Sequence, residues 1–390
     1  MKRERSNRVA FIYSDGTFLG VYNYLCSLMA AMQKLSGHRL IPVVIAGNRS
    51  DAQTRFAGVE ILRTSLLDRG SPSYLMRKAK CRILGWDRSL ADFLLKHDIQ
   101  VLSHSPHLGV QSVVATVGWI GDFQHVHFPA LFSGEELRRR DSAFMSLCLR
   151  STKLIVSSNC ALADLSKFCP NQAHKANVLQ FVAPAPLDGA PSLEELQATY
   201  DFDSPFFLLP NQFWAHKNHR VVIEALRELR DKTPEIRILA TGMTHDYRNP
   251  AFFDLLMEYA AECRVLDTFR VLGPIPYPHL MGLMQHSIAV INPSKFEGWS
   301  TTVEESKSMG KRIILSDIPV HREQKPSLGL FFNPDSHCEL ADMLVLTSKN
   351  FDVEADIEEQ KKAASLLSSR QLEFGCVYER IVEEALAGIP

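Results

Sequence analysis

Several features that would place a protein in a class at once are missing from this chain of 390 residues. Its eight cysteines form no Cys-x-x-Cys pair and lack histidines at a metal-site spacing, so we expect reduced thiols and no metal centre. No apolar run reaches the length of a membrane-spanning helix. A formal net charge of −1 gives no reason to expect a nucleic-acid partner.

We also expect no secretory signal peptide, because the charged N-terminus carries an apolar run only as long as a strand. We therefore expect a cytoplasmic protein. The segment 73–86 qualifies this expectation, since it mixes Arg77, Lys78, Lys80 and Arg82 with apolar and aromatic residues. A basic amphipathic helix of this kind can lie on an anionic membrane, here at its inner face. The alternative is an ordinary solvated helix face.

The composition supports two folded domains, because 46% of the residues are apolar and the chain is long enough for two cores. Strands alternate with helices on both sides of the segment 182–191, which holds three prolines and a glycine. This pattern predicts two doubly wound α/β domains with parallel sheets. The predicted parts are an N-terminal domain (1–184), a linker (185–203), a C-terminal domain (204–370) and a C-terminal helix (371–390) that packs back on the first domain.

The segment 288–319 reads as one strand–loop–helix–strand unit. Its strand is broken at Pro293, and the loop that follows carries Glu297 and Gly298. Ser300 and the two threonines after it can cap a helix, which Gly310 is placed to end. A carboxylate, hydroxyl groups and backbone N–H groups thus meet at one point, and such a point favours an anion, above all phosphate.

Two stretches in the first half are also candidates for ligand contact. Gly16 and Gly20 lie in the loop after the first strand, where glycine can admit a ligand to the backbone or only allow helix–sheet packing. A polar cluster follows a later strand, at the sheet edge where α/β proteins bind ligands. Its members are Asp122, Gln124, His125 and His127.

Residues 297–305, EGWSTTVEE, resemble the Glu-x7-Glu motif of the retaining nucleotide-sugar glycosyltransferases of family four. Pro293 and Ser294 precede the motif, as they often do in that family. The segments IGDFQHVHFP (120–129) and NQFWAHKNH (211–219) are similar to the family's first-domain and phosphate-loop segments. The resemblance covers most of the chain and implies the GT-B fold, in which two Rossmann-like domains face each other across a cleft. The N-terminal domain would bind the acceptor and the C-terminal domain the donor.

The resemblance implies roles for individual residues. Glu297 would contact the donor sugar, Lys217 would neutralise the diphosphate, and His125 would lie against the sugar from the first domain. Glu305 would hold the ribose hydroxyls. The further donor-binding residues are Asn211 and Gln212, Leu272 and Ile275 beside the base, and Gly298, Trp299, Ser300 and Thr301 with their N–H groups on the diphosphate. The acceptor or cleft residues would be Gly16, Gly20, Asp122, Gln124 and His127.

One departure from the family concerns Gln212, which stands where an arginine commonly precedes the lysine by five residues. An amide can donate to a phosphate but lacks the charged fork of a guanidinium. Lys217 would then carry more of the leaving-group charge, helped by His216 or by the helix N-terminus near Thr302.

Each of these residues also has a purely structural interpretation. Glu305 could complete a capping box with Thr302. Glu297 could be a solvated loop charge, Lys217 a surface lysine and His125 a core histidine.

We therefore expect a retaining, metal-independent glycosyltransferase without a cofactor. It would move a hexose from a nucleotide sugar to a glycan or lipid-linked acceptor, in cell-surface polysaccharide or lipopolysaccharide assembly. A lysine and a helix N-terminus can stabilise the departing diphosphate without a metal. Two alternatives stay open: a nucleotide-sugar epimerase on the same fold, and an inactive nucleotide-sugar-binding scaffold protein, which Gln212 favours.

Overall fold

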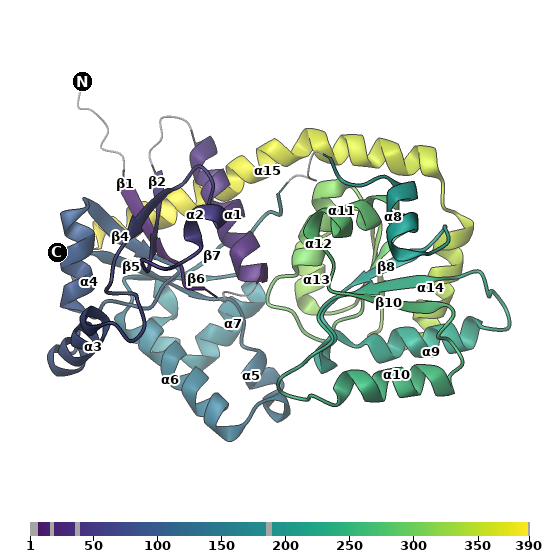
Figure 1. Cartoon of the computed structure of the whole chain (residues 1–390), viewed down its shortest axis with the longest axis horizontal. Helices are drawn as coiled ribbons and strands as arrows, with labels where there is room; N and C mark the ends of the chain where they lie inside the picture. The colour runs from purple at the N-terminus through teal and green to yellow at the C-terminus, as the bar shows by residue number, and fades with distance from the viewer. Residues whose placement is uncertain (1–6, 16–18, 36–39, 185–188, 389–390) are drawn as a thin grey trace. The chain divides into compact units, whose positions relative to one another are not determined.

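A computed structural model describes residues 7–15, 19–35, 40–184 and 189–388. The chain divides into two compact units. The first unit comprises residues 1–129, 133–182 and 369–390, and the second comprises residues 130–132 and 183–368. Each unit is built on a parallel β-sheet with helices packed on it (Figure 1), so the predicted fold class is confirmed.

The sheet of the first unit has seven parallel strands in the order β3-β2-β1-β4-β5-β6-β7. The five inner strands are mostly buried, as expected for a sheet covered on both faces, whereas the edge strands β3 and β7 have no buried residue. They are β1 (Asn7–Ile12), β2 (Leu40–Ala46), β3 (Glu60–Arg63), β4 (Ile99–Ser103), β5 (Ala115–Ile120), β6 (Lys153–Val156) and β7 (Ala176–Val178).

Capping residues set the starts of several helices in this unit. Ser133 and Glu136 form a capping box at the start of α6, and Asp87 caps α4 through the N–H of Leu90. The helices are α1 (Leu19–Lys34), α2 (Ala52–Arg55), α3 (Pro72–Leu84), α4 (Arg88–Lys96), α5 (Gln124–His127), α6 (Gly134–Arg150) and α7 (Asn159–Phe168), with 3-10 helices η1 (Pro129–Leu131) and η2 (Pro170–Lys175).

The sheet of the second unit has six parallel strands in the order β10-β9-β8-β11-β12-β13. Successive side chains of β8 point to opposite faces, so Phe207 and Leu209 join one apolar core while Phe206 and Leu208 join the other. The strands are β8 (Phe207–Pro210), β9 (Ile238–Thr241), β10 (Phe269–Gly273), β11 (Val290–Asn292), β12 (Ile313–Ser316) and β13 (Gly329–Phe332).

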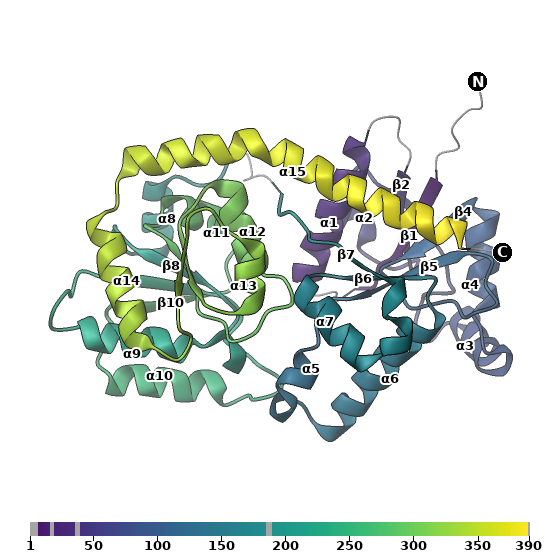
Figure 2. The ribbon, with the colours of Figure 1, turned by 180° about the vertical axis from the view of Figure 1, so that it is seen from behind.

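Helices cover both faces of the second sheet (Figures 1 and 2). One core contains residues of α9, α10 and α14, and the other contains residues of α8, α11 and α12. The helices are α8 (Leu193–Tyr200), α9 (His219–Leu229), α10 (Phe252–Glu262), α11 (Tyr277–His286), α12 (Thr301–Met309), α13 (Pro319–Gln324) and α14 (His337–Lys349), with the 3-10 helix η3 (Ala215–Lys217).

The segment predicted as a linker, 185–203, contains helix α8 of the second unit. Ser192 and Glu195 form a capping box at its start, and Leu196 is fully buried in the core. The prolines that indicate a linker therefore end before Ser192. Residues 185–188 lie outside the described part of the chain.

The C-terminal segment is one long helix, α15 (Val353–Ala387), which begins well before the helix predicted at 371–390. Gly375 lies inside it because a larger residue would not fit: a Cβ there would stand 2.8 Å from the carbonyl oxygen of Ala31 in α1. Residues 369–390 belong to the first unit, and the preceding part of α15 belongs to the second (Figures 1 and 2).

Candidate active site

Two loops meet at the carboxyl edge of the second sheet. From β8 the chain continues to β9 on one side, whereas β11 lies on the other side of β8, so the strand order reverses between β8 and β11. Open α/β sheets bind ligands at such a switch point. The loop after β8 carries Lys217, and the loop after β11 carries Glu297, so the topology brings these two predicted residues together.

Hydrogen bonds join the two loops. The N–H of Lys295 donates to the carbonyl oxygen of His216 at 2.8 Å. The amide nitrogen of Asn218 donates to the carbonyl oxygens of Pro293, at 3.1 Å, and Pro334, at 2.8 Å. Asn218 has a φ of +58°, which asparagine tolerates better than most residues. These bonds fix the position of Lys217 relative to the second loop.

Lys217 Nζ donates to Glu297 Oε1 at 2.6 Å, and both side chains are largely buried. Burial alone would raise the pKa of Glu297, but the charge of Lys217 holds this pKa below its ordinary value. Glu297 is therefore a carboxylate at neutral pH. The interpretation of these two residues as a solvated charge and a surface lysine does not fit this pair.

His321, on α13, interacts electrostatically with both members of this pair and is fully buried. Its Nδ1 is 2.9 Å from the carbonyl oxygen of Ser316, which can only accept, so Nδ1 carries the proton and Nε2 carries a lone pair. Burial lowers the pKa of His321, although Glu297 opposes the shift. Sequence reasoning missed His321 because it follows the next strand, β12, and only the parallel sheet returns it to this edge.

The start of α12 is held by a buried polar network. Ser300 is the N-cap: its hydroxyl accepts from the N–H of Val303 at 3.4 Å and from the amide of Asn292 at 2.8 Å. Its own N–H donates to Gln324 Oε1 at 3.1 Å. Of the N–H groups expected at the diphosphate, that of Ser300 is thus engaged inside the protein. Sequence reasoning also missed Gln324.

Glu305 lies on α12 and is not part of a capping box, since the cap is Ser300 and not Thr302. Tyr277 Oη donates to Glu305 Oε1 at 3.0 Å. Burial raises the pKa of Glu305 to about 7, although the hydrogen bond from Tyr277 opposes the shift. Leu272 and Ile275 are partly buried against the same core as Tyr277, so the predicted base and ribose residues lie on one side of this sheet.

Gln212 and Asn211 make their contacts inside the second unit. Gln212 Oε1 accepts from the N–H of Met243 at 2.7 Å, and the amide of Asn211 donates to Asn292 Oδ1 at 3.0 Å. The loop after β9 approaches so closely that a Cβ on Gly242 would stand 2.5 Å from the carbonyl oxygen of Asn211. The oxygen of the Gln212 amide is therefore committed to the β9 loop.

The polar cluster of the first unit does not gather at one point. His125 Nε2 is 3.1 Å from Asp141 on α6, whereas His127 Nε2 is 2.8 Å from Asp164 on α7. Asp122 accepts from the N–H of Gln124 at 2.8 Å.

His125 is packed among aromatic rings, since its ring lies 5.1 Å from that of Phe144 and 6.2 Å from that of Phe123. Burial lowers its pKa, although Asp141 opposes the shift.

Of the two glycines predicted in the loop after the first strand, Gly16 lies outside the described residues. Gly20 lies in the first turn of α1, and a Cβ built on it would meet no atom within 4 Å. Helix–sheet packing therefore does not require a glycine at position 20.

Comparison with known families decides the class of the second unit. Residues 195–364 match the family described as glycosyl transferases group 1. The second unit is a glycosyltransferase domain. The matched region contains Lys217, Glu297 and Glu305, and the prediction of a glycosyltransferase is confirmed. No protein with a curated description matches the sequence.

Solved structures resemble the whole chain. A glycosyltransferase from Rickettsia africae ESF-5 is 15% identical with a TM-score of 0.68, over 97% of this chain and 98% of that one. Anabaena Alr3699/HepE in complex with UDP and glucose is 14% identical with a TM-score of 0.67, over 97% and 98%. Sucrose-phosphate synthase from Thermosynechococcus elongatus is 13% identical with a TM-score of 0.65, over 97% and 99%. These likenesses confirm the GT-B fold.

Two features are absent from the part of the chain that the structure describes. None of the helices in the described ranges combines the length and apolar character that crossing a membrane requires. Within the same ranges, no three His, Cys, Asp or Glu side chains are grouped so that they could hold a metal ion.

Proposed function

We propose that this glycosyltransferase moves a hexose from a nucleotide sugar to a glycan or lipid-linked acceptor with retention of configuration and without a metal. The observation that carries the donor assignment is the Lys217–Glu297 pair beside the start of α12, at the switch point of the second sheet. The Anabaena protein of similar fold was crystallised with UDP-glucose, which supports a nucleotide sugar as donor. Retention and a role in cell-surface polysaccharide or lipopolysaccharide assembly rest on the motif resemblance.

The Lys217–Glu297 pair and the start of α12 can stabilise the charges that develop on both sides of the bond that breaks. Cleavage of a sugar–diphosphate bond builds negative charge on the diphosphate and positive charge on the sugar ring. Lys217 would exchange Glu297 for a phosphate oxygen, and Glu297 would then accept hydrogen bonds from sugar hydroxyls. The start of α12 adds aimed N–H dipoles, each of which is typically worth roughly 3–4 kcal/mol of barrier. Glu305 would accept hydrogen bonds from the ribose hydroxyls.

The donor assignment is tested with a panel of UDP-, GDP-, ADP- and dTDP-hexoses. We expect one base to stabilise the protein by roughly 2.7 kcal/mol at 100 times its Kd and to support transfer or slow hydrolysis. Lys217→Met should abolish turnover. Lys295→Met is the matched control, because this lysine lies in the adjoining loop after β11, with Glu297, but pairs with exposed Asp335.

Product analysis by NMR separates the alternatives. An α-linked product from an α-linked donor supports retention, and an inverted product contradicts it. A new nucleotide sugar formed from the donor alone would indicate an epimerase. Binding without turnover of any donor would indicate an inactive binding protein.

The proposal includes peripheral contact with an anionic membrane through α3. Leu75 and Met76 are each 58% exposed and Ile83 is 83% exposed. Lys78, Lys80 and Arg82 are also exposed. At 100° per residue, the three apolar side chains form one stripe with these cations on both sides.

Arg77 does not belong to this surface, because it is buried in an ion pair with Asp87 at 2.7 Å. Three of the four basic residues of the segment thus remain for a membrane.

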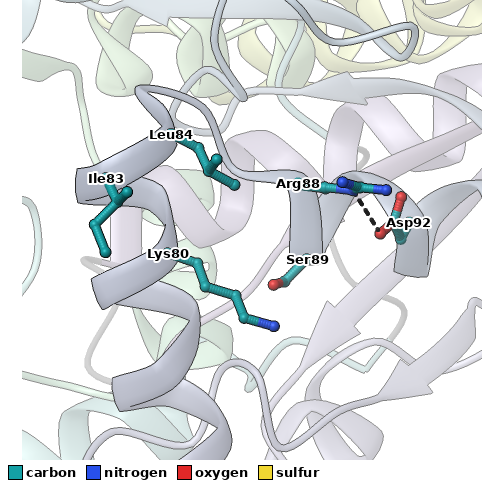
Figure 3. A pocket seen from close by; sticks show the side chains of 6 residues that line it. All are labelled: Lys80, Ile83, Leu84, Arg88, Ser89 and Asp92. Carbon is teal, nitrogen blue, oxygen red and sulfur yellow. Dashed lines mark ion pairs between the residues drawn. The ribbon is translucent and has the colours of Figure 1, made fainter.

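A hollow of about 420 Å³ between α3 and α4 adjoins the stripe (Figure 3). Two cationic side chains and a hydroxyl line it, and Arg88 lies 3.6 Å from Asp92. A phosphate of a lipid headgroup could replace Asp92 as the partner of Arg88, with acyl chains along the apolar rim. The lining residues are Lys80, Ile83, Leu84, Arg88, Ser89 and Asp92.

Vesicle co-sedimentation tests this contact. We expect the protein to bind vesicles that contain phosphatidylglycerol, not vesicles of phosphatidylcholine alone, and to release them at high salt. Ile83→Glu should weaken binding at least tenfold. Leu346→Glu, on a leucine that is 59% exposed in the second unit, is the control. Equal binding by both variants would contradict the contact through α3.

A further inference from the structure

Gln324, the last residue of α13, binds the start of α12 at three points. Its Oε1 accepts from the N–H of Ser300 at 3.1 Å, and its Nε2 donates to the carbonyl oxygen of Ser300 at 3.0 Å. Nε2 also donates to Glu304 Oε1 at 3.1 Å. Because two of the partners can only accept and one can only donate, these bonds fix which way the amide points.

The surroundings make this amide hard to replace. Gln324 and Ser300 are each 2% exposed, and Glu304 is 1% exposed. Lys307 Nζ completes the network by donating to Glu304 Oε1 and to the carbonyl oxygen of Gln324, both at 2.8 Å. A buried carboxylate is tolerated only when it is paired and hydrogen-bonded in this way. Loss of the amide would remove the acceptor of the buried Ser300 N–H and one of the donors to Glu304.

The same network reaches the phosphate loop. Ser300 Oγ accepts from Asn292 at 2.8 Å, and Asn292 in turn accepts from Asn211 at 3.0 Å. Gln324 therefore closes a chain of buried hydrogen bonds that runs from the loop after β8 to the first turn of α12. Donors at an anion site act through their fixed direction, and a displacement of about 1 Å can lower a rate by about 100-fold.

We propose that Gln324 is a positioning residue for glycosyl transfer, which acts through Ser300 to aim the start of α12 at the donor diphosphate. By engaging the N–H of Ser300, it also selects the neighbouring N–H groups of the first turn, those of Thr301 and Thr302, as the ones presented to the anion. This inference rests on the proposed donor site. It adds a residue from outside the Glu-x7-Glu motif to that site.

Two variants test the role. Gln324→Met keeps the approximate length of the side chain and removes all three hydrogen bonds. We expect it to lower kcat by about 30- to 100-fold with a much smaller change in the KM of the donor. Gln324→Glu keeps an acceptor for the N–H of Ser300 but sets a carboxylate against Glu304, with Lys307 offsetting part of the repulsion.

The pH profile of Gln324→Glu distinguishes positioning from a general loss of structure. A protonated carboxyl can again donate to Glu304, so the kcat of the variant relative to wild type should rise by about tenfold for each pH unit below pH 8, until the carboxyl is mostly protonated. Gln360→Met is the matched control, since Gln360 donates to Asp356 at 2.8 Å and to Gln285 in the same unit. It should leave kcat unchanged.

Hydrogen exchange supplies a measurement that does not depend on turnover. Peptides that cover residues 298–304 should exchange faster in Gln324→Met than in wild type, and those of the control should not. Wild type could neither transfer nor hydrolyse any nucleotide sugar while this exchange difference is found. That result would contradict the proposed function but support the role of Gln324 in holding the start of α12.

Three results would overturn the positioning role. The first is a kcat of Gln324→Met within threefold of an active wild type. The second is a relative activity of Gln324→Glu that does not change with pH. The third is failure of both variants to fold, which would assign Gln324 to folding.

Discussion

Lys217 Nζ and Glu297 Oε1 are 2.6 Å apart, although the two residues come from loops that follow different strands. The cation assigned to the diphosphate is thus held by the carboxylate assigned to the sugar. In the absence of substrate each charge stabilises the other, and both can be exchanged for groups of the donor. A lysine placed only to hold the loop would not need a partner at the switch point of the sheet.

From this pair we expect Lys217→Met and Glu297→Gln each to lower kcat/KM by at least 100-fold, in line with the loss of one aimed charged group. The double variant should be little worse than either single one, because residues that act as a unit have non-additive effects on rate. Steady-state kinetics with the active donor measures this. Full additivity of the two losses would show that the residues act independently.

Glu305 should make the stability of the protein depend on pH. Its pKa of about 7 exceeds the ordinary value of 4.5, so the folded state binds more protons than the unfolded state between these values. The contribution of Glu305 to the free energy of unfolding should therefore be most favourable at or below pH 4.5. This contribution should fall as the pH rises toward 7. Glu305→Gln should be more stable than wild type at pH 8, by up to about 3 kcal/mol, and nearly equal to it at pH 5.

Thermal unfolding of both proteins at the two pH values checks this difference. Tyr277→Phe is the companion variant. Loss of the hydrogen bond that opposes the shift should raise the pKa of Glu305 further and enlarge the pH effect. A stability difference that is the same at pH 5 and pH 8 would contradict the assignment to Glu305.

The sheets could be predicted from the sequence because they depend on local patterns, whereas the roles of the motif residues stay predictions. Apolar runs mark buried strands, and the largely apolar run Ile99–Ser103 is β4 of the structure. The motif places Glu297 and Glu305 on one loop and one helix. The match of the second unit to group 1 glycosyl transferases confirms the enzyme class that this motif indicates.

The polar cluster of the first unit shows a limit of predicting side-chain contacts from local sequence patterns. His125 and His127 are close in sequence, but they lie on the single turn of α5, where residues two positions apart point to different sides. They therefore bond to different helices. The sequence pattern predicts that these side chains converge at the end of a strand. It does not reveal the helical turn that directs the two histidines to different sides.

His321 and Gln324 were missed for another reason. Both lie on α13, after the strand that follows the motif, and no local spacing links them to Glu297 or Ser300. Their proximity arises from the parallel pairing of β11 with β12, which places the segments after both strands at the same edge. Such contacts follow only from the tertiary structure.

Lys311 should be among the residues most important for the stability of the second unit. Its side chain is fully buried, and Nζ donates to Asp356 at 2.7 and 2.9 Å and to the carbonyl oxygens of Gln285 and Ser287. It thus ties the start of α15 to α11 and β12. We expect Lys311→Met to lower stability by about 3–5 kcal/mol, because Asp356 is left without its charged partner.

The double variant Lys311→Met with Asp356→Leu should recover much of this loss, since it removes both charges. Chemical unfolding, monitored by the fluorescence of the second unit, measures the stability of the single and the double variant. A double variant as unstable as the single one would show that the hydrogen bonds to Gln285 and Ser287, and not the ion pair, carry the stability.

Gly242 should be required for activity because it lets the β9 loop approach the phosphate loop. Its φ is +134°, and a Cβ would stand 2.5 Å from the carbonyl oxygen of Asn211 and 3.0 Å from the Cα of Gln212. Gly242→Ala must therefore displace the segment that leads to Lys217. We expect a loss of kcat/KM of about 100-fold, the size that a displacement of about 1 Å can cause.

Gly189→Ala separates this steric effect from backbone strain. Gly189 also has a positive φ, +85°, but a Cβ on it would meet no atom within 4 Å. Strain at a positive φ costs on the order of 1–3 kcal/mol, so both variants should lose some stability. Only Gly242→Ala should lose activity when both are assayed well below their unfolding temperatures. Equal activity of the two variants would show that the β9 loop does not set the position of Lys217.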